Sequence, residues 1–287
     1  MGAVKPIIEV EGLCKDYPVS TGARALLASL SMRRPLLRAL DHVSFSLQPG
    51  HVVGLVGLNG AGKTTLIKSL CDLLEPSRGR VAIAGYILPQ AAARVRAIIG
   101  YVPSDERSFF WRLTGRSNLE FFAGLYGLGA REARERTTRL LGEFGLTEKA
   151  DLRFHNYSSG MRKRLAIVRG LLHSPRILLM DEPTNSLDVK WDRFLRRFVR
   201  HWVRSRPDRL VLWSTHRMEE MCDLCDAVIG LRQGRLVYWG DVQGAADGIW
   251  MGDRSEADFR SPPGDGPRHC PGDIHPPVAQ SRPADSP

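Results

Sequence analysis

Long hydrophobic runs are absent from this sequence of 287 residues. The strongest apolar stretches, 52–56 and 177–180, are far shorter than the roughly 20 residues that a membrane-spanning helix requires. The apolar core of a signal peptide is missing as well, because Lys5, Pro6 and Glu9 occupy the positions where it would lie. We therefore expect neither a transmembrane segment nor a secretory signal.

Cysteine is scarce too: the five cysteines provide no disulfide framework for a chain of this length, and we expect a reducing compartment.

Acidic residues are outnumbered by basic ones, since the chain has 41 Lys and Arg but only 31 Asp and Glu, which gives a net charge of +10 at pH 7. This surplus fits an acidic partner, such as a nucleotide, a nucleic acid or an anionic membrane face. It fits equally well a simple bias toward arginine, which supplies 34 of the 41 cations.

The sequence does contain enough apolar material for a packed core, because 43% of its residues are hydrophobic and 25% are charged. Residues 1–245 have a globular composition, whereas 246–287 are rich in proline and poor in apolar residues, so we expect a disordered tail there. Within the globular part, 19–38 resemble an insertion rich in Ala, Leu and Arg at helical spacing. Residues of about 105–165 carry helical patterns with little strand character, which predicts an inserted helical subdomain.

Short apolar runs alternate with helical patterns in the rest of the globular part. Residues 51–56, 176–181 and 210–214 are such runs, and polar residues or glycine follow each of them, while 62–74 have helical periodicity. This alternation predicts an α/β fold with a mostly parallel sheet covered on both faces. Sites in such folds gather at the carboxyl ends of the strands, so the polar clusters there are candidate functional residues.

A glycine-rich loop after the first of these runs matches the pattern G-x-x-x-x-G-K-[ST]. Its glycines allow successive backbone N–H groups to point at a phosphate, and the helix after it adds its positive N-terminal end. Lys63 would reach the β- and γ-phosphates, and the hydroxyl of Thr64 would coordinate Mg²⁺. The loop consists of Gly57, Leu58, Asn59, Gly60, Ala61, Gly62, Lys63 and Thr64. It predicts a nucleotide-binding site.

Two adjacent acids, Asp181 and Glu182, end the apolar run 177–180. A buried strand would deliver both to the edge of the sheet, and alternation along the strand would point their side chains apart. One carboxylate can then hold the Mg²⁺ shell while the other orients or deprotonates an attacking water. Together with the phosphate loop, these acids predict nucleotide hydrolysis.

Further motifs narrow this prediction to one family. Residues 157–165, 181–188 and 213–216 resemble the signature loop, the acidic strand end with its D-loop, and the switch histidine of ATP-binding-cassette (ABC) ATPases. Tyr17 stands where that family places an aromatic residue against adenine. The motifs follow the family's order and spacing over roughly residues 5–240. The pattern over 113–116 and the run 161–164 resemble the exporter branch of the family, the ABC-2-type exporters of drugs and polysaccharides.

The resemblance implies a P-loop NTPase fold with a mostly parallel sheet, an N-terminal antiparallel β portion and the inserted helical subdomain. It also implies ATP and Mg²⁺ as cofactors. Tyr17 would stack on the adenine, and the phosphate loop, extended by Thr65, would hold the phosphates.

The same resemblance assigns the chemistry to residues that follow two strands. Asp181 would join Thr64 in holding Mg²⁺, Glu182 would polarise the attacking water, and His216 would contact the γ-phosphate. Glu182 and His216 are therefore the candidate catalytic residues.

Ser158, Ser159 and Gly160, at the start of a predicted helix, would donate hydrogen bonds to the γ-phosphate of an ATP that another subunit holds. A chain with one phosphate loop and one signature loop completes two sites only by pairing with a second cassette. The resemblance thus implies a head-to-tail dimer, and a second, identical copy is the expected partner.

Two positions depart from the family pattern. Ser159 replaces the first of two glycines that usually follow the signature serine, and because serine keeps the backbone N–H we expect function to survive. Ser104 and Asp105 stand where a glutamine normally ligates Mg²⁺ and senses the transport partner. Either the Asp105 carboxylate or a water could take the ligand position, and the sequence leaves this open.

As a member of this family, the chain would power export through a separate transmembrane permease, at the cytoplasmic face of the cell membrane. The aromatic run 109–111 lies where family members meet the permease, and it could dock that partner or cap the core of the helical subdomain. The alternative is a soluble ABC-type ATPase acting on ribosomes or nucleic acid. Such proteins usually carry two cassettes or long coiled-coil insertions, so we expect no nucleic-acid partner.

Overall fold

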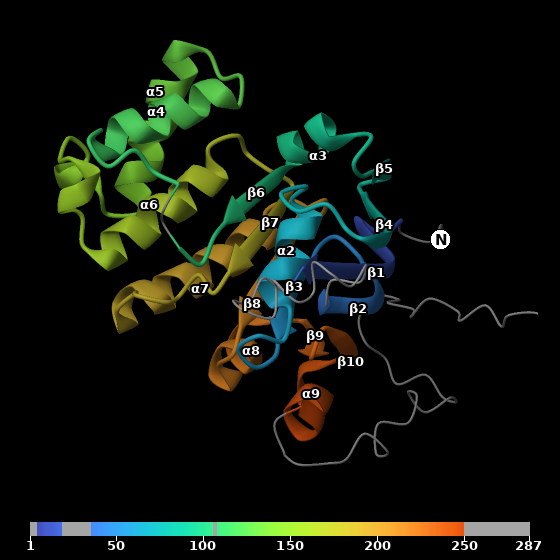
Figure 1. The fold of residues 1–287 in the computed structure, drawn as a ribbon. Coiled ribbons are helices and arrows are strands. Elements are labelled where there is room, and N and C mark those ends of the chain that lie inside the picture. The colour runs from blue at the N-terminus through green and yellow to red at the C-terminus, as the bar shows by residue number, and fades with distance from the viewer. Residues whose placement is uncertain (1–4, 19–35, 106–107, 250–287) are drawn as a thin grey trace, which may run out of the picture.

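The computed structural model describes residues 5–18, 36–105 and 108–249, which form two β-sheets flanked by helices (Figure 1). The larger sheet has the strand order β10-β9-β3-β8-β7-β6. Its strands are parallel from β9 to β6, and β10 pairs with β9 in the antiparallel direction. This confirms the predicted α/β fold with a mostly parallel sheet. The strands are β3 Val52–Val56, β6 Ile99–Val102, β7 Ile177–Asp181, β8 Leu210–Thr215, β9 Ala227–Arg232 and β10 Arg235–Gly240.

The smaller sheet, with the order β2-β1-β4-β5, is antiparallel, and it confirms the antiparallel β portion near the N-terminus. Its strands are β1 Ile8–Pro18, β2 Leu36–Leu47, β4 Arg78–Ile83 and β5 Tyr86–Ile87.

One expectation fails in this sheet. Residues 36–38, assigned above to a helically spaced insertion over 19–38, begin β2 and pair with residues 16–18 of β1. A short leucine-rich segment fits a helix or a strand, and here the free edge of β1 selects the strand. Residues 19–35 lie outside the described residues.

Alternation along the parallel strands divides the interior into two hydrophobic cores. In β8, Leu210 and Leu212 belong to the core shared with the antiparallel sheet, whereas Val211 and Trp213 belong to the opposite core. The first core contains residues of α2 Lys63–Leu70 and α3 Ala92–Ile98, and the second contains residues of α7 Val189–Arg204, α8 Met218–Leu224 and α9 Val242–Ile249. Both faces of the parallel sheet are therefore covered, as predicted.

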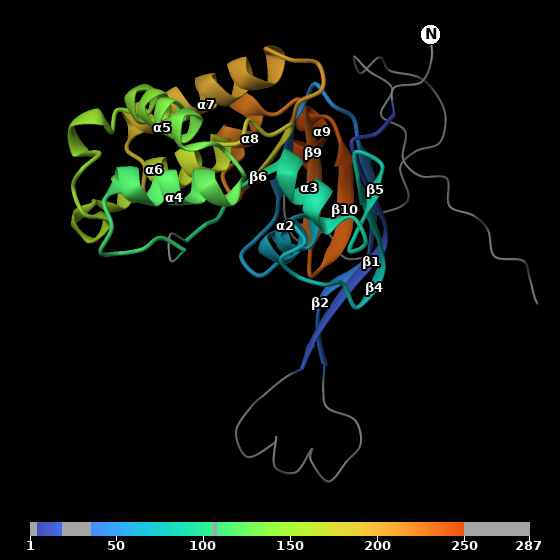
Figure 2. The same ribbon diagram turned by 90° about the horizontal axis from the view of Figure 1, so that it is seen from above.

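A helical region lies to one side of the sheets, and Figure 2 shows it well separated from the antiparallel strands. It contains α4 Gly115–Leu125, α5 Ala130–Glu143 and α6 Ser159–Leu171, with short 3-10 turns at Thr147–Lys149 and Phe154–Asn156. Helices α4 and α5 lie within the predicted interval 105–165, and α6 begins inside it and continues to Leu171. Because α6 leads into β7, it connects the helical region to the parallel sheet.

The last described helix, α9, ends at Ile249, so the predicted tail 246–287 begins within a helix, and 250–287 lie outside the described residues. Across the described ranges, no helix has both the length and the apolar character needed to cross a bilayer.

Gly100 in β6 lies close to the backbone of helix α6. A Cβ atom there would lie 2.1 Å from the carbonyl oxygen of Gly170 and 2.7 Å from Cδ2 of Leu178. We expect Gly100→Ala to lower the free energy of unfolding by about 2 kcal/mol or more, because the backbone of α6 must move away. Urea unfolding followed by circular dichroism measures this.

The matched control is Gly124→Ala in α4, where a Cβ atom would meet nothing within 4 Å. Helix propensity there predicts a gain of up to about 1 kcal/mol. Equal stabilities of the two variants would contradict the close contact between β6 and α6.

Candidate active site

The phosphate loop connects β3 to α2, as the sequence predicts. Gly60 and Gly62 have left-handed backbones, with φ of +82° and +105°. Gly62 caps α2, and a Cβ atom on it would lie 2.7 Å from the carbonyl oxygen of Ala39 in β2, so this position requires glycine. At the tip of the loop Leu58, Asn59 and Gly60 are exposed, whereas Gly57, Ala61 and Lys63 are buried, and Thr64 and Thr65 are partly exposed in the first turn of α2.

Lys63 is folded back across the loop that precedes it. Its ammonium donates hydrogen bonds to the carbonyl oxygens of Gly57 (2.8 Å) and Leu58 (3.2 Å), and it lies 3.9 Å from Oε1 of Glu182. Burial lowers the pKa of Lys63, and the nearby carboxylates of Glu182 and Asp181 oppose that shift. The ammonium thus bridges the phosphate loop and the acids at the end of β7.

Asp181 is fully buried at the end of β7, and its carboxylate accepts two hydrogen bonds. The Thr64 hydroxyl donates to Oδ2 and the Ser214 hydroxyl to Oδ1, both at 2.7 Å. The two residues predicted to hold Mg²⁺ are therefore in direct contact. Hydroxyl and carboxylate oxygens are the hard donors that Mg²⁺ prefers, so this pair fits that ion.

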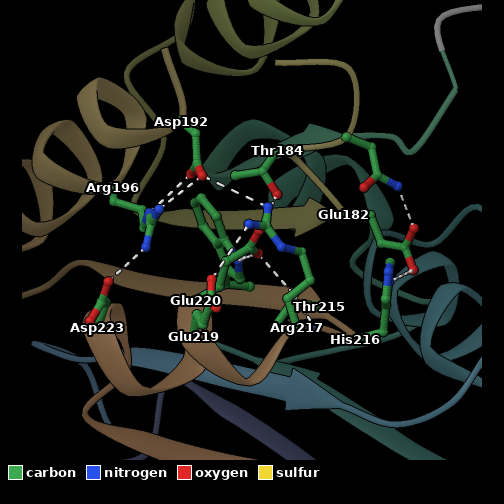
Figure 3. Close-up of polar contacts among 12 residues, drawn as sticks. Glu182, Thr184, Asp192, Arg196, Thr215, His216, Arg217, Glu219, Glu220 and Asp223 are labelled. Atoms are coloured by element: carbon green, nitrogen blue, oxygen red, sulfur yellow. Dashed lines mark hydrogen bonds and ion pairs between the residues drawn. The ribbon is translucent and has the colours of Figure 1, made fainter. Parts of the chain in front are cut away.

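Glu182 follows the last residue of β7, and its backbone is left-handed with φ of +46°. Its carboxylate lies between two other side chains: Oε2 accepts from Nδ2 of Asn185 at 2.6 Å, and Oε1 lies 3.3 Å from Nδ1 of His216 (Figure 3). The structure thus brings the two predicted catalytic residues, Glu182 and His216, into contact with each other.

Ser214 and Asn185 are site residues that the sequence reasoning did not single out. The Ser214 hydroxyl both donates to Asp181 and accepts from the backbone N–H of Glu182 at 2.9 Å, so it fixes the two acids together. The available signal is that Ser214 and Thr215 form the polar end of an otherwise apolar strand, within the segment 213–216 that carries the switch histidine. Asn185 follows the acids by a short turn, in which its side chain can reach back to Glu182.

The signature residues begin helix α6. Ser158 is its N-cap and accepts from the backbone N–H of Met161 at 3.3 Å. Ser158 and Ser159 are exposed, and a Cβ atom on Gly160 would lie 3.0 Å from the carbonyl oxygen of Ser186 in the D-loop. Among the contacts of the described residues, none joins these three residues to the phosphate loop of the same chain.

Tyr17 lies near the end of β1, partly buried, where it pairs with Leu37 of β2. Two residues further along β2 is Ala39, whose carbonyl lies beside Gly62 of the phosphate loop. The strand pair that carries Tyr17 therefore flanks the loop, and the stacking of Tyr17 on adenine stays a prediction.

Ser104 and Asp105 follow β6 and are exposed. The fully buried Lys163 of α6 donates to the carbonyl oxygens of Pro103 (3.1 Å) and Ser104 (2.8 Å). The segment after β6 is thereby attached to the helix whose first residues form the signature loop.

The aromatic run 109–111 is divided between the core and the surface. Phe109 is buried and stacks on Phe154 with ring centroids 4.7 Å apart, so it belongs to the core of the helical region. Phe110 and Trp111 remain 47% and 48% exposed, and these two side chains are available to a partner.

Comparisons with known proteins identify the family of this chain. The family model described as "ABC transporter" matches residues 40–185. The ABC transporter ATP-binding protein NatA of Bacillus subtilis is 36% identical over 224 residues, which cover 78% of this chain and 89% of NatA. The daunorubicin resistance ATP-binding protein DrrA2 of Streptomyces coeruleorubidus is 38% identical over 223 residues, or 76% of this chain and 67% of DrrA2.

A solved structure shares the fold. It is a dimeric ATP-binding cassette in a post-hydrolysis state with ADP and Pi, and its TM-score is 0.72 over 82% of this chain and 98% of that chain, at 22% identity. With the phosphate loop, the acidic strand end and the switch histidine in one place, the family prediction is confirmed: this chain belongs to the ABC transporter family and is an ATP-binding ABC ATPase.

Proposed function

We propose that this chain hydrolyses Mg·ATP as one half of a head-to-tail dimer and so powers export through a separate membrane permease. The observation that carries the proposal is the pairing of Thr64 with Asp181 and of Glu182 with His216, with the Glu182 carboxylate 3.9 Å from the ammonium of Lys63. Lys63 is a cation for the phosphates, and Thr64 and Asp181 are a pair of hard oxygen ligands. Glu182 is a candidate general base, with His216 in contact with its carboxylate.

Thr64 and Asp181 would hold Mg²⁺, which would neutralise charge on the phosphate oxygens. Glu182 would accept a proton from the attacking water or orient it, because its carboxylate is partly exposed and faces the phosphate loop. His216 would donate to the γ-phosphate oxygens as negative charge builds up, and Tyr17 would stack on adenine. No bond to the protein forms in this scheme, so catalysis rests on position and charge.

The signature loop supports the dimer. Ser158 and Ser159 are exposed at the N-terminus of α6 and Gly160 is partly exposed there, and none of the three makes a described contact with the phosphate loop of the same chain. Helix N-termini bind anions, so this end of α6 fits the γ-phosphate held by a second copy. The related cassette with the same fold was solved as a dimer.

Export through a permease is supported by the relatives and by one surface feature. DrrA2 is a drug-resistance protein by name. Phe110 and Trp111 form an exposed aromatic pair beside the segment after β6, and an aromatic pair of this kind fits an amphipathic segment of a membrane protein. A permease partner would place the chain at the cytoplasmic face of the membrane.

Purification of this chain from detergent-solubilised membranes should recover a multi-span protein bound to it. Recovery of ribosomes or nucleic acid would instead favour the soluble alternative.

Ser158→Trp tests the trans arrangement. We expect ATPase activity to fall about a hundredfold, because the bulky side chain displaces the donors that face the γ-phosphate of the partner. ATP affinity of the monomer should stay unchanged, because the phosphate loop is intact, and equilibrium dialysis with ATP provides that control.

Mixing two inactive variants gives the decisive measurement. Copies with Ser158→Trp have an intact phosphate loop, and copies with Lys63→Ala have an intact signature loop, so a mixed dimer contains one complete site. Phosphate release from the mixture should exceed that of either variant alone. A fully active Ser158→Trp protein would contradict the proposed dimer.

A further inference from the structure

Glu220 is a fully buried acid that the proposed chemistry does not use. It lies in α8, four residues after His216, and Figure 3 shows it to one side of the pair Glu182 and His216. An ionised carboxylate is costly to bury unless its oxygens are fully hydrogen-bonded. Its surroundings therefore indicate what it is for.

Four donors converge on this carboxylate. Oε1 accepts from the Thr184 hydroxyl and from Nη1 of Arg217, both at 2.6 Å. Oε2 accepts from the Thr215 hydroxyl at 2.8 Å and from Nε1 of Trp213 at 3.2 Å. Each oxygen thus has two donors, and an ionised carboxylate, which only accepts, is the one side chain of this shape that satisfies all four.

Two of these donors come from the segments that carry the catalytic residues. Thr184 lies two residues after Glu182, and the next residue, Asn185, donates to the Glu182 carboxylate. Thr215 immediately precedes His216, and its hydroxyl also accepts from the backbone N–H of Arg217. Glu220 is therefore hydrogen-bonded to both segments at once.

The charge of Glu220 is balanced within the fold. Arg217 is its ion-pair partner and lies 3.8 Å from Asp192 of α7, which in turn forms a two-pronged ion pair with Arg196. Arg196 also reaches Asp223 of α8 at 2.9 Å. This network ties α7 to α8 behind the site, and Figure 3 shows it as a row of alternating charges that ends at Glu220.

We propose that Glu220 is a positioning residue that sets the relative placement of Glu182 and His216 during ATP hydrolysis. It acts through Thr184 on one side and Thr215 on the other, and it does not touch the phosphates. The inference rests on the proposed function, because the proposed function is what assigns Glu182 and His216 to ATP hydrolysis.

Glu220→Gln is the direct test in the full-length protein. An amide of the same shape must present an NH₂ group to donors on one side, so either Arg217 or Trp213 loses its acceptor. We expect kcat for ATP to fall about tenfold to a hundredfold, because small displacements of reacting groups have effects of this size. The KM for ATP should stay within about twofold, because the phosphate loop is untouched.

Combination with His216→Ala separates positioning from a general loss of structure. If Glu220 acts by placing His216, Glu220→Gln should lower kcat by a smaller factor in the His216→Ala background than in the wild type. The fold-decreases of the two single variants then do not multiply in the double variant. Losses that multiply would overturn the inference, and so would a wild-type kcat for Glu220→Gln.

Asp192→Asn is the matched control, because it changes a buried acid of the same network to an amide and leaves the contacts of Glu220 with Thr184 and Thr215 in place. It should lower the melting temperature while kcat stays within about twofold. An equal fall in kcat for Asp192→Asn and Glu220→Gln would overturn the inference.

Thr184→Val decides the question if Glu220→Gln does not fold. It is nearly isosteric and removes only one bond to Glu220, so we expect about a threefold or larger fall in kcat at unchanged KM, and a wild-type kcat would overturn the inference.

An active Glu182→Gln protein would defeat the proposed function itself. An inactive Glu182→Gln beside a fully active Glu220→Gln would defeat this inference alone.

Discussion

Glu182→Gln is expected to lower the rate of ATP hydrolysis about a thousandfold or more while ATP still binds. The amide keeps the shape of the side chain and its reach toward Asn185 and His216, but it cannot accept a proton from the attacking water. ATP then stays intact in both sites, and the dimer that it bridges persists. Single-turnover phosphate release measures the rate, and gel filtration with ATP shows a dimer containing two nucleotides.

Glu148→Gln is a suitable control, since Glu148 is exposed in a 3-10 turn of the helical region. It should hydrolyse ATP at the wild-type rate. A Glu182→Gln protein that stays monomeric with its sites saturated would contradict the assembly, and one that hydrolyses ATP normally would contradict the role of Glu182.

Lys63→Ala is expected to weaken ATP binding about a hundredfold. The ammonium is buried against the phosphate loop, so its bonds to phosphate oxygens form in a poorly solvated place, where a charge-assisted hydrogen bond contributes most. Fluorescence titration with a nucleotide analogue measures the dissociation constant.

Lys68→Ala provides the control within the same helix, because Lys68 is exposed and lies in the last turn of α2, whereas the phosphate loop leads into its first turn. Nucleotide affinity should not change in that variant. Equal losses for Lys63→Ala and Lys68→Ala would mean that overall charge, and not a specific contact, attracts the nucleotide.

The sequence predicts the phosphate loop and the acids well because each is a contiguous motif. Glycines at fixed positions allow only a few backbone paths, and a buried apolar run that ends in Asp181 and Glu182 has one obvious place at the edge of a sheet. The parallel sheet follows from the same alternation of runs. Patterns within short stretches of sequence are therefore enough to predict the fold class.

The supporting residues could not be found in this way. Ser214, Asn185 and Glu220 are ordinary polar residues in the sequence, and their roles arise only when β7, β8 and α8 are placed side by side. Glu220 in particular lies in a short acidic stretch that, read alone, fits the exposed face of a helix. Its burial is decided by tertiary packing against Trp213.

Segment boundaries were the other source of error. Leu36 and Leu37 fit a helical pattern, but β1 offers unpaired backbone groups at its edge, and pairing with them outweighs the weak helical preference of a few residues. The aromatic run shows the same limit, because composition does not reveal that Phe109 turns inward while its two neighbours stay outside.

Helix α6 has a mechanical consequence. Its buried Lys163 donates hydrogen bonds to the backbone carbonyls of Pro103 and Ser104, and its first turn contains the signature loop. A helix of 13 residues is rigid and about 20 Å long. A displacement of the segment after β6 would therefore move the start of α6, where Ser158 and Ser159 lie. In the proposed complex with a permease, this rigid connection would let a displacement of residues 103–104 change the position of the signature loop and with it the rate of ATP hydrolysis.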